Sequence, residues 1–223
     1  MFKIIREDIR AILERDPAAR NVLDVIFCYP GFHAILIHRL AHFLYKKRIV
    51  FFSRLLSYIN RFITGVDVHP AAKIGNRVFI DHGLGVVIGE SVEIGDNVII
   101  YQGVTLGGTG KDTGKRHPTI GNNVIISSGA KVLGPLKVGD NCKIGAGAVL
   151  LNDIPPNCTV VGVPARIVKR DNYQIYRVRN EIDLDQGRLT NPIQKQIEEL
   201  TESIKCIEKK LVELEAKIMG EAV

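Results

Sequence analysis

Ile88-Gly-Glu-Ser-Val-Glu-Ile-Gly-Asp-Asn-Val-Ile-Ile100 is the stretch that decides the fold, because an aliphatic residue returns in it at every sixth position. The residue that follows is usually small or acidic, as Gly89 and Gly95 are here. A period of six suits neither a helix nor a hairpin, whereas it suits a short strand followed by a tight turn. Three such units make one triangular coil, and stacked coils bury a ladder of aliphatic side chains.

The same period continues on both sides and predicts a β-coil domain over residues 66–168, with a two-residue insertion before Ile88 and a longer one after Leu106. Its aliphatic positions are Val68, Ile74, Ile80, Ile88, Ile94, Ile100, Leu106, Ile120, Ile126, Val132, Val138, Ile144 and Leu150. The pattern resembles the hexapeptide repeat of left-handed parallel β-helices. The left hand is implied by that resemblance and not by the period, because most crossover connections are right-handed.

The flanking segments have other periods, so we predict a mixed fold. Residues 1–65 carry apolar residues at helical spacing and predict an N-terminal α-helical domain. Residues 169–192 are polar and are predicted to be a linker. Residues 193–220 repeat Ile and Leu in alternating steps of three and four, which predicts a C-terminal coiled-coil helix. A lone amphipathic helix packed on its own domain is the alternative, but a trimeric β-helix would favour three coiled strands.

Composition narrows the class of protein. The chain has 223 residues, of which 46% are hydrophobic and 24% charged, an ordinary soluble balance. We see neither a signal peptide nor CxxC spacing among the four cysteines, and therefore expect a cytoplasmic protein. Basic residues interrupt the most apolar stretch, residues 34–64, too often for a membrane span. The net charge of +6 comes without a nucleic-acid-binding motif and suits a polyphosphorylated coenzyme.

Two of the six histidines lie where the repeat is interrupted. His82 stands beside the two-residue insertion, where the chain departs from the regular coil and can form a functional site. His117 lies in the longer insertion, which is rich in glycine and basic residues but lacks the spacing of a phosphate-binding P-loop. A flexible basic loop is the alternative for that insertion. We expect His33, His38 and His42, on the helical segment, to be structural or at the surface.

Several motifs together are more specific than the repeat. They are Asp67-Val-His-Pro-Ala-Ala-Lys-Ile-Gly75, Asp81-His82-Gly83, Val87-Ile-Gly-Glu90, Gln102-Gly-Val-Thr-Leu-Gly-Gly-Thr-Gly-Lys111, Arg116-His-Pro118 and Gly162-Val-Pro-Ala-Arg166, preceded by Arg15-Asp-Pro-Ala18 and Gly31-Phe-His33. Over residues 1–168 the chain resembles the serine acetyltransferase family. That resemblance implies transfer of acetyl from acetyl-CoA to L-serine, giving O-acetyl-L-serine and CoA, the first step of cysteine biosynthesis.

The resemblance also implies residue roles. His82 would be the general base that takes the proton of the seryl hydroxyl, and Asp67 would orient its ring. The acetyl group would pass directly within a ternary complex, because neither Cys nor Ser in the motifs suggests an acyl-enzyme. No metal is expected.

For the substrates, the resemblance implies one pocket and one groove between subunits of a homotrimer. Asp16 and Asp81 would hold the serine amino group, Arg116 its carboxylate, and His117 would face the same pocket. Acetyl-CoA would lie along the β-helix and would contact Gly107, Ser128, Lys143 and Ala146.

Alternatives stay open at this point. The acceptor could be a sugar or homoserine, although Asp16, Asp81 and Arg116 favour an amino acid. A γ-carbonic-anhydrase-like zinc enzyme would need a third histidine where Asn122 and Asn123 stand. A non-catalytic trimeric scaffold is the third alternative. The helical region is short compared with members that form hexamers, so a trimer is expected and a hexamer stays open. The sequence ends in Val223 instead of the family's isoleucine, which puts binding of O-acetylserine sulfhydrylase in question.

Overall fold

The computed structural model of the chain describes residues 2–110, 113–170, 201, 203–205, 207 and 208. The chain divides into two compact units, Met1–Leu189 and Thr190–Val223. In the second unit, the described residues 201, 203–205, 207 and 208 are helical. The rest of the predicted coiled coil, and the predicted linker from residue 171 on, lie outside the described residues.

Four helices open the first unit: α1 (Phe2–Arg15), α2 (Val22–Cys28), α3 (Pro30–Lys46) and α4 (Val50–Thr64). The side chain of Asn21 accepts hydrogen bonds from the N–H groups of Leu23 and Asp24 and so caps α2. Gly65, with a φ of 73°, ends α4 in the left-handed conformation. Within the described part of the chain, no single helix has the length and apolarity to cross a membrane, although α2 and α3, bent by 72°, satisfy that test as a pair.

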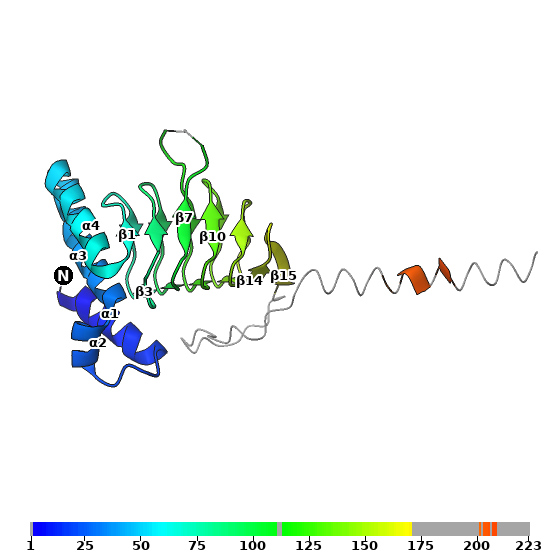
Figure 1. Cartoon of the computed structure of the whole chain (residues 1–223), viewed down its shortest axis with the longest axis horizontal. Coiled ribbons are helices and arrows are strands. Elements are labelled where there is room, and N and C mark those ends of the chain that lie inside the picture. The colour runs from blue at the N-terminus through cyan, green and yellow to red at the C-terminus, as the bar shows by residue number, and fades with distance from the viewer. Residues whose placement is uncertain (1, 111–112, 171–200, 202, 206, 209–223) are drawn as a thin grey trace, which may run out of the picture. The chain divides into compact units, whose positions relative to one another are not determined.

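Short strands then wind into three sheets (Figure 1). Sheet A contains β1 (Asp67–Val68), β4 (Val87–Ile88), β7 (Thr105–Gly107), β10 (Lys131–Leu133) and β13 (Val149–Leu150). Sheet B contains β2 (Lys73–Ile74), β5 (Glu93–Ile94), β8 (Thr119–Ile120) and β11 (Lys137–Val138). Sheet C contains β3 (Phe79–Ile80), β6 (Ile99–Ile100), β9 (Ile125–Ile126), β12 (Lys143–Ile144), β14 (Cys158–Val161) and β15 (Arg166–Arg170).

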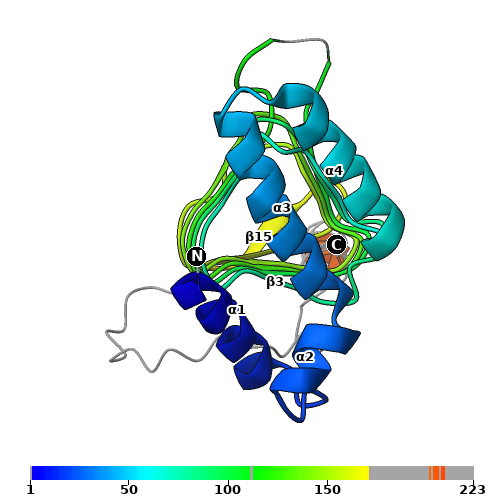
Figure 2. The same cartoon turned by 90° about the vertical axis from the view of Figure 1, so that its left-hand side faces the viewer.

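The three sheets form the sides of a triangle, and α3 lies across its N-terminal end (Figure 2). Inside, the predicted aliphatic ladder is confirmed. In sheet A, Val68 pairs with Ile88, which pairs with Leu106, and the ladder continues through Val132 to Leu150. All five side chains are buried. Each contributes about 1.5–3 kcal/mol through burial of apolar surface, so the stack itself is the core.

One corner of the triangle is a ladder of asparagines. Asn97, Asn123, Asn141 and Asn157 all have positive φ, which asparagine tolerates better than most residues. Their amides bond from coil to coil: Asn97 donates to Asn123 at 2.6 Å, Asn123 to Asn141 at 3.1 Å and Asn141 to Asn157 at 2.9 Å. Arg15 of α1 joins the first rung by donating to Asn97. The ladder therefore aligns the coils and docks α1.

The C-terminal end of the stack differs from its body. β14 continues sheet C in parallel with β12, but β15 returns antiparallel to β14. The repeat carries no signal for this hairpin, because an antiparallel return breaks the six-residue period. The predicted fold class, helices followed by a left-handed β-helix of hexapeptide repeats, is otherwise confirmed for the first unit.

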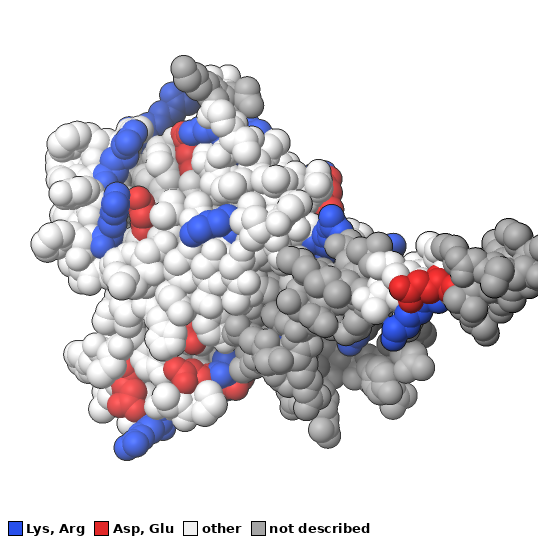
Figure 3. All heavy atoms as spheres, turned by 45° about the vertical axis from the view of Figure 1, so that its right-hand side comes forward, with Lys and Arg blue, Asp and Glu red and all other residues white. Residues whose placement is uncertain are grey.

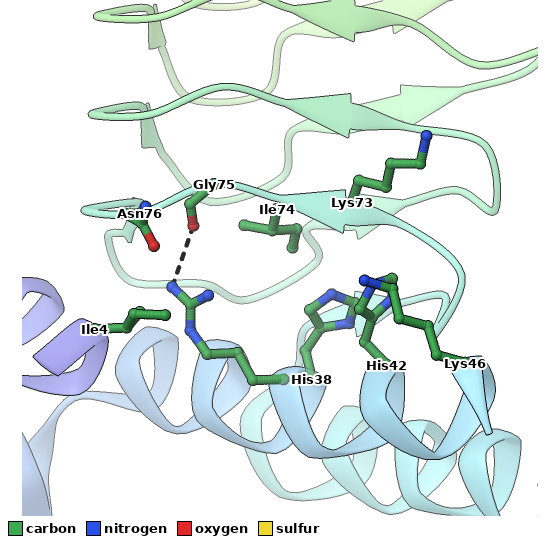
Figure 4. Close-up of a pocket in the computed structure, with 9 residues that line it drawn as sticks. Ile4, His38, His42, Lys46, Lys73, Ile74, Gly75 and Asn76 are labelled. Atoms are coloured by element: carbon green, nitrogen blue, oxygen red, sulfur yellow. Dashed lines mark hydrogen bonds between the residues drawn. The ribbon is translucent and has the colours of Figure 1, made fainter. Parts of the chain in front are cut away.

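A cavity of about 530 Å³ lies between α3 and the first coil (Figure 4). His38 is buried there, Nδ1 of His42 bonds the Pro70 carbonyl at 2.8 Å, and Arg39 donates to Asp8 at 2.8 Å. Lys73, at the rim, is paired with Glu93. Most charges of the cavity are thus neutralised by the protein. The buried His38 and the hydrogen-bonded His42 fit the expectation that the helical histidines are structural or at the surface.

From the asparagine ladder we predict that two substitutions at one rung lower the free energy of unfolding by different amounts. Asn123→Ala removes two ladder hydrogen bonds and places an alanine at a φ of 55°. We expect a loss of about 1–3 kcal/mol in the free energy of unfolding. Asn123→Gly loses the same bonds without the backbone strain, and its loss should be smaller. Chemical denaturation of the three proteins checks the order, which an alanine variant as stable as the glycine variant would contradict.

Burial makes His38 a source of acid sensitivity. Burial, helped by nearby His42, lowers the pKa of His38 from 6.5 to about 3. Between those values the unfolded chain binds a proton that the folded chain does not, so stability falls as pH falls below 6.5, by at most about 1.4 kcal/mol per pH unit. His38→Phe should therefore show a shallower loss of unfolding free energy between pH 7.5 and 5. Equal slopes for the two proteins would refute this role.

Candidate active site

Three of the predicted site residues gather in an acidic cluster, which we define as Asp16, Tyr29, Asp81 and His82. Asp16 follows α1, Tyr29 lies between α2 and α3, and the other two follow β3. The Tyr29 hydroxyl donates to Oδ2 of Asp16 at 2.5 Å, and Oδ1 accepts the N–H of Ala18 at 2.8 Å. A helix end, a helix junction and a strand end therefore converge on one place.

The two carboxylates of the acidic cluster have little positive charge beside them. Burial raises the pKa of Asp81 above its ordinary value, and the negative charge of Asp16 raises it further, while His82 lowers it. Burial also raises the pKa of Tyr29, and the adjacent Asp16 adds to that shift. Two neighbouring carboxylates that are partly removed from water are a site for a small cation such as an ammonium group.

His82 projects from the turn between β3 and β4. Its φ of 59° lies in the left-handed region, which a histidine occupies at an energetic cost, and its side chain is 72% exposed. Nε2 lies 3.9 Å from Oδ1 of Asp81. The ion pair that the structure describes for Asp67 joins it to Arg61 at 3.1 Å. The pairing of His82 with Asp67 therefore stays a prediction.

A second group lies at the other end of β4, and we define it as the arginine cluster: Glu90, Ser91, Arg116 and His117. Arg116 and His117 arrive on the loop between β7 and β8, which stands away from the coils (Figure 1). Arg116 donates to Oε2 of Glu90 at 2.5 Å, and this bond lowers the pKa of Glu90. The carboxylate thus holds the guanidinium in place.

His117 is the buried member of the arginine cluster. Its ring lies against Gly89, where an added Cβ would come within 2.1 Å of the ring. Its Nδ1 is 2.9 Å from the Ser91 hydroxyl. Burial lowers the pKa of His117, and the neighbouring Arg116 lowers it further, so the ring is neutral at pH 7.

Sequence reasoning missed Tyr29 and Ser91, and it placed Glu90 in a family motif without giving it a role. Glu90 and Ser91 occupy ordinary turn positions of an uninterrupted hexad, and nothing in the period distinguishes them. Tyr29 is one aromatic residue among others in an apolar helical region. Only the fold brings them against Asp16, Arg116 and His117.

The two clusters lie at opposite edges of sheet A. The chain between them, residues 86–90, includes β4. An extended strand advances about 3.3 Å per residue, so the two edges are on the order of 15 Å apart. That separation exceeds the length of a small amino acid, so a ligand of that size cannot reach both clusters of one chain.

The four residues predicted for the coenzyme do not gather at one edge. Ser128 and Ala146 follow β9 and β12 on the same corner as His82, where the N–H of Gly147 bonds the Ser128 carbonyl at 2.9 Å. Gly107 ends β7 at the opposite edge, and Lys143 begins β12 in sheet C. A cavity of about 550 Å³ adjoins that opposite edge and is lined by Thr109, Leu133, Gly134, Pro135, Leu136, Leu151, Asn152 and Asp153. Among the described residues, no three His, Cys, Asp or Glu side chains are placed to hold a metal ion.

Comparisons with known proteins agree with this arrangement. The family model described as bacterial transferase hexapeptide (six repeats) matches residues 71–108 and 117–152. The model described as serine acetyltransferase, N-terminal, matches residues 1–36, the segment that contains Asp16 and Tyr29.

Among curated relatives, the serine acetyltransferase of Synechococcus elongatus is 50% identical over 100% of this chain and 89% of its own length. Among solved structures, serine acetyltransferase from Brucella abortus in complex with coenzyme A has a TM-score of 0.75 and 47% identity, over 78% of this chain and 69% of that one. The Neisseria gonorrhoeae enzyme in complex with serine has a TM-score of 0.73 and 43% identity, over 75% and 69%. This chain belongs to the serine acetyltransferase family.

Proposed function

We propose that the protein is a serine O-acetyltransferase, which moves the acetyl group of acetyl-CoA to L-serine and thereby catalyses the first step of cysteine biosynthesis. The observation that carries the proposal is the convergence of two carboxylates, Asp16 and Asp81, beside the exposed imidazole of His82. A cationic amino group and a hydroxyl close to it are the two features of serine that such a site recognises.

In the proposed reaction, His82 removes the proton of the seryl hydroxyl as the oxygen attacks the thioester carbonyl. An imidazole placed in this way contributes about 10²–10⁴-fold to rate. The tetrahedral intermediate then expels CoA thiolate, which receives the proton from His82, and O-acetyl-L-serine remains. Asp81 stands 3.9 Å from the ring and stabilises the imidazolium that forms. Asp67 on the same corner is the second candidate for that task.

The carboxylate of serine is proposed to bind Arg116. A guanidinium matches the two oxygens of a carboxylate, and Glu90 at 2.5 Å orients it from behind. A sugar acceptor offers neither an ammonium group for the acidic cluster nor a carboxylate for Arg116. Homoserine offers both but is longer by one methylene, and so it is the second candidate acceptor.

Because the two clusters lie at opposite edges of sheet A, we propose that a complete site forms between two copies of the chain. His82 of one copy and Arg116 of a neighbour would then face the same serine. This requirement supports the homotrimer expected from the sequence, with three equivalent sites. Ser128 and Ala146 would line the acetyl-CoA groove from the copy that supplies His82.

The outer surface of α4 supports association. Its polar residues Ser53, Ser57 and Asn60 face inward, where Ser53 bonds the Ala41 carbonyl at 2.7 Å and Asn60 the Ala34 carbonyl at 3.1 Å. Its outer side exposes large apolar residues: Phe51 72%, Phe52 60%, Tyr58 67%, Phe62 86% and Ile63 63%. In the described part of the face shown in Figure 3, residues other than Lys, Arg, Asp and Glu predominate, and the charged side chains lie in scattered groups. An apolar surface of this extent is typical of a protein interface.

Two expectations stay predictions. Cytoplasmic location follows from the sequence alone. Binding to O-acetylserine sulfhydrylase concerns Val223, which lies outside the described residues.

The function is tested by thiol release from acetyl-CoA with L-serine, L-homoserine or a hexose as acceptor. We expect the highest kcat/KM with L-serine. His82→Ala should lower kcat by about 10²–10⁴-fold with its fold intact by circular dichroism. Full activity of that variant, or a preference for the hexose, would overturn the proposal.

Subunit complementation tests the shared site. His82→Ala and Arg116→Ala proteins should each have little activity alone. If a site takes His82 from one chain and Arg116 from another, random 1:1 reassembly restores about a quarter of the wild-type sites. Mixing without dissociation is the control and should restore none. Activity that stays at the level of the single variants after reassembly would show that each site lies within one chain.

A further inference from the structure

Ser91 makes an unusual number of contacts for a turn residue of the coil. It follows Gly89 and Glu90 at the corner after β4. Its backbone N–H lies 3.3 Å from Nδ1 of His117, and its hydroxyl lies 2.9 Å from the same atom. The hydroxyl also accepts the backbone N–H groups of Arg116 at 3.1 Å and His117 at 3.2 Å. One serine thus fixes both the backbone and the ring of the arginine cluster.

These contacts determine which ring nitrogen of His117 carries the proton. A backbone N–H can only donate, so Nδ1 of His117 must accept from it. The hydroxyl gives the same answer, because its two lone pairs receive two N–H groups and its own proton is left to donate to Nδ1. In the neutral ring, the proton therefore resides on Nε2.

The surroundings of the ring keep it neutral and in place. Burial and the positive charges of Arg116 and Lys115 oppose a second proton, and Glu90 favours one. Gly89 leaves room for the ring, since an added Cβ would lie 2.2 Å from Nε2. His117 is thus a donor through Nε2 and lacks a free lone pair with which to act as a base.

We propose that Ser91 is a positioning residue that holds His117 as an Nε2–H hydrogen-bond donor to the carboxylate of serine beside Arg116. This inference rests on the proposed function. It separates the roles of the two imidazoles of the shared site. His82 is exposed and is not held by a serine in this way. It accepts the proton of the hydroxyl, whereas His117 binds the carboxylate end of the substrate.

The test uses the full-length protein and its Ser91→Ala and Ser91→Thr variants. Threonine keeps the hydroxyl and alanine removes it, while both keep the backbone N–H. Ser91→Ala should lower kcat/KM for L-serine about 10-fold, mainly through a higher KM, because two N–H groups and Nδ1 lose a partner. Ser91→Thr should keep most of the wild-type kcat/KM. Glu93→Gln, in the exposed pair with Lys73 on sheet B, is the control and should match wild type.

A spectroscopic measurement separates this inference from the function. In ¹⁵N-histidine-labelled protein, with His117 assigned by a His117→Gln variant, we expect the Nε2–H tautomer in wild type and Ser91→Thr. A larger share of the Nδ1–H tautomer is expected in Ser91→Ala, because Nδ1 then keeps only the longer 3.3 Å contact with the backbone N–H. An Nδ1–H tautomer in wild type, or unchanged tautomer and KM in Ser91→Ala, would overturn the inference. Failure of wild type to acetylate serine would instead overturn the proposed function and leave the tautomer result interpretable.

Discussion

The constraint on which the structure depends is the filling of the triangular core by one aliphatic side chain per six residues. Ile88, Leu106 and Val132 occupy successive rungs of sheet A and are fully buried, so the interior has no room for a polar site. Chemistry is therefore confined to the corners, where the backbone turns and the period can be interrupted. Both interruptions of the repeat are used in this way. The short one presents His82, and the long one returns Arg116 and His117 to the opposite edge.

This geometry supports the proposal that the site is divided between chains. A side of the triangle is wider than an amino acid, and the acidic and arginine clusters lie at its two ends. Neither cluster suffices alone, since one offers negative charge and a base and the other a guanidinium and a hydrogen-bond donor. The inverted pattern of α4, with Asn60 inside and Phe62 86% exposed, gives an independent reason for the chains to associate.

Much of this could be predicted from the sequence, because the six-residue period dictates which side chains face inward and its interruptions mark His82 and His117. The approach of Asp16 to Asp81 could be predicted only through the family motifs, since they come from different elements. Ser91 could not be found, and Glu90 stood in a family motif without a role, because a turn position has the same sequence pattern whether or not a distant loop packs against it. The antiparallel return of β15 and the pairing of Asp67 with Arg61 also depend on contacts that no period records.

The central claim is that one serine is held by two chains, with its hydroxyl at His82 and its carboxylate at Arg116. A crystal structure of the assembled protein with L-serine and a non-reactive desulfo analogue of CoA measures this directly. The account predicts the seryl oxygen about 3 Å from a ring nitrogen of His82 and the carboxylate on Arg116 of a neighbouring chain. A serine bound wholly within one chain, or with its hydroxyl at His117, would contradict it.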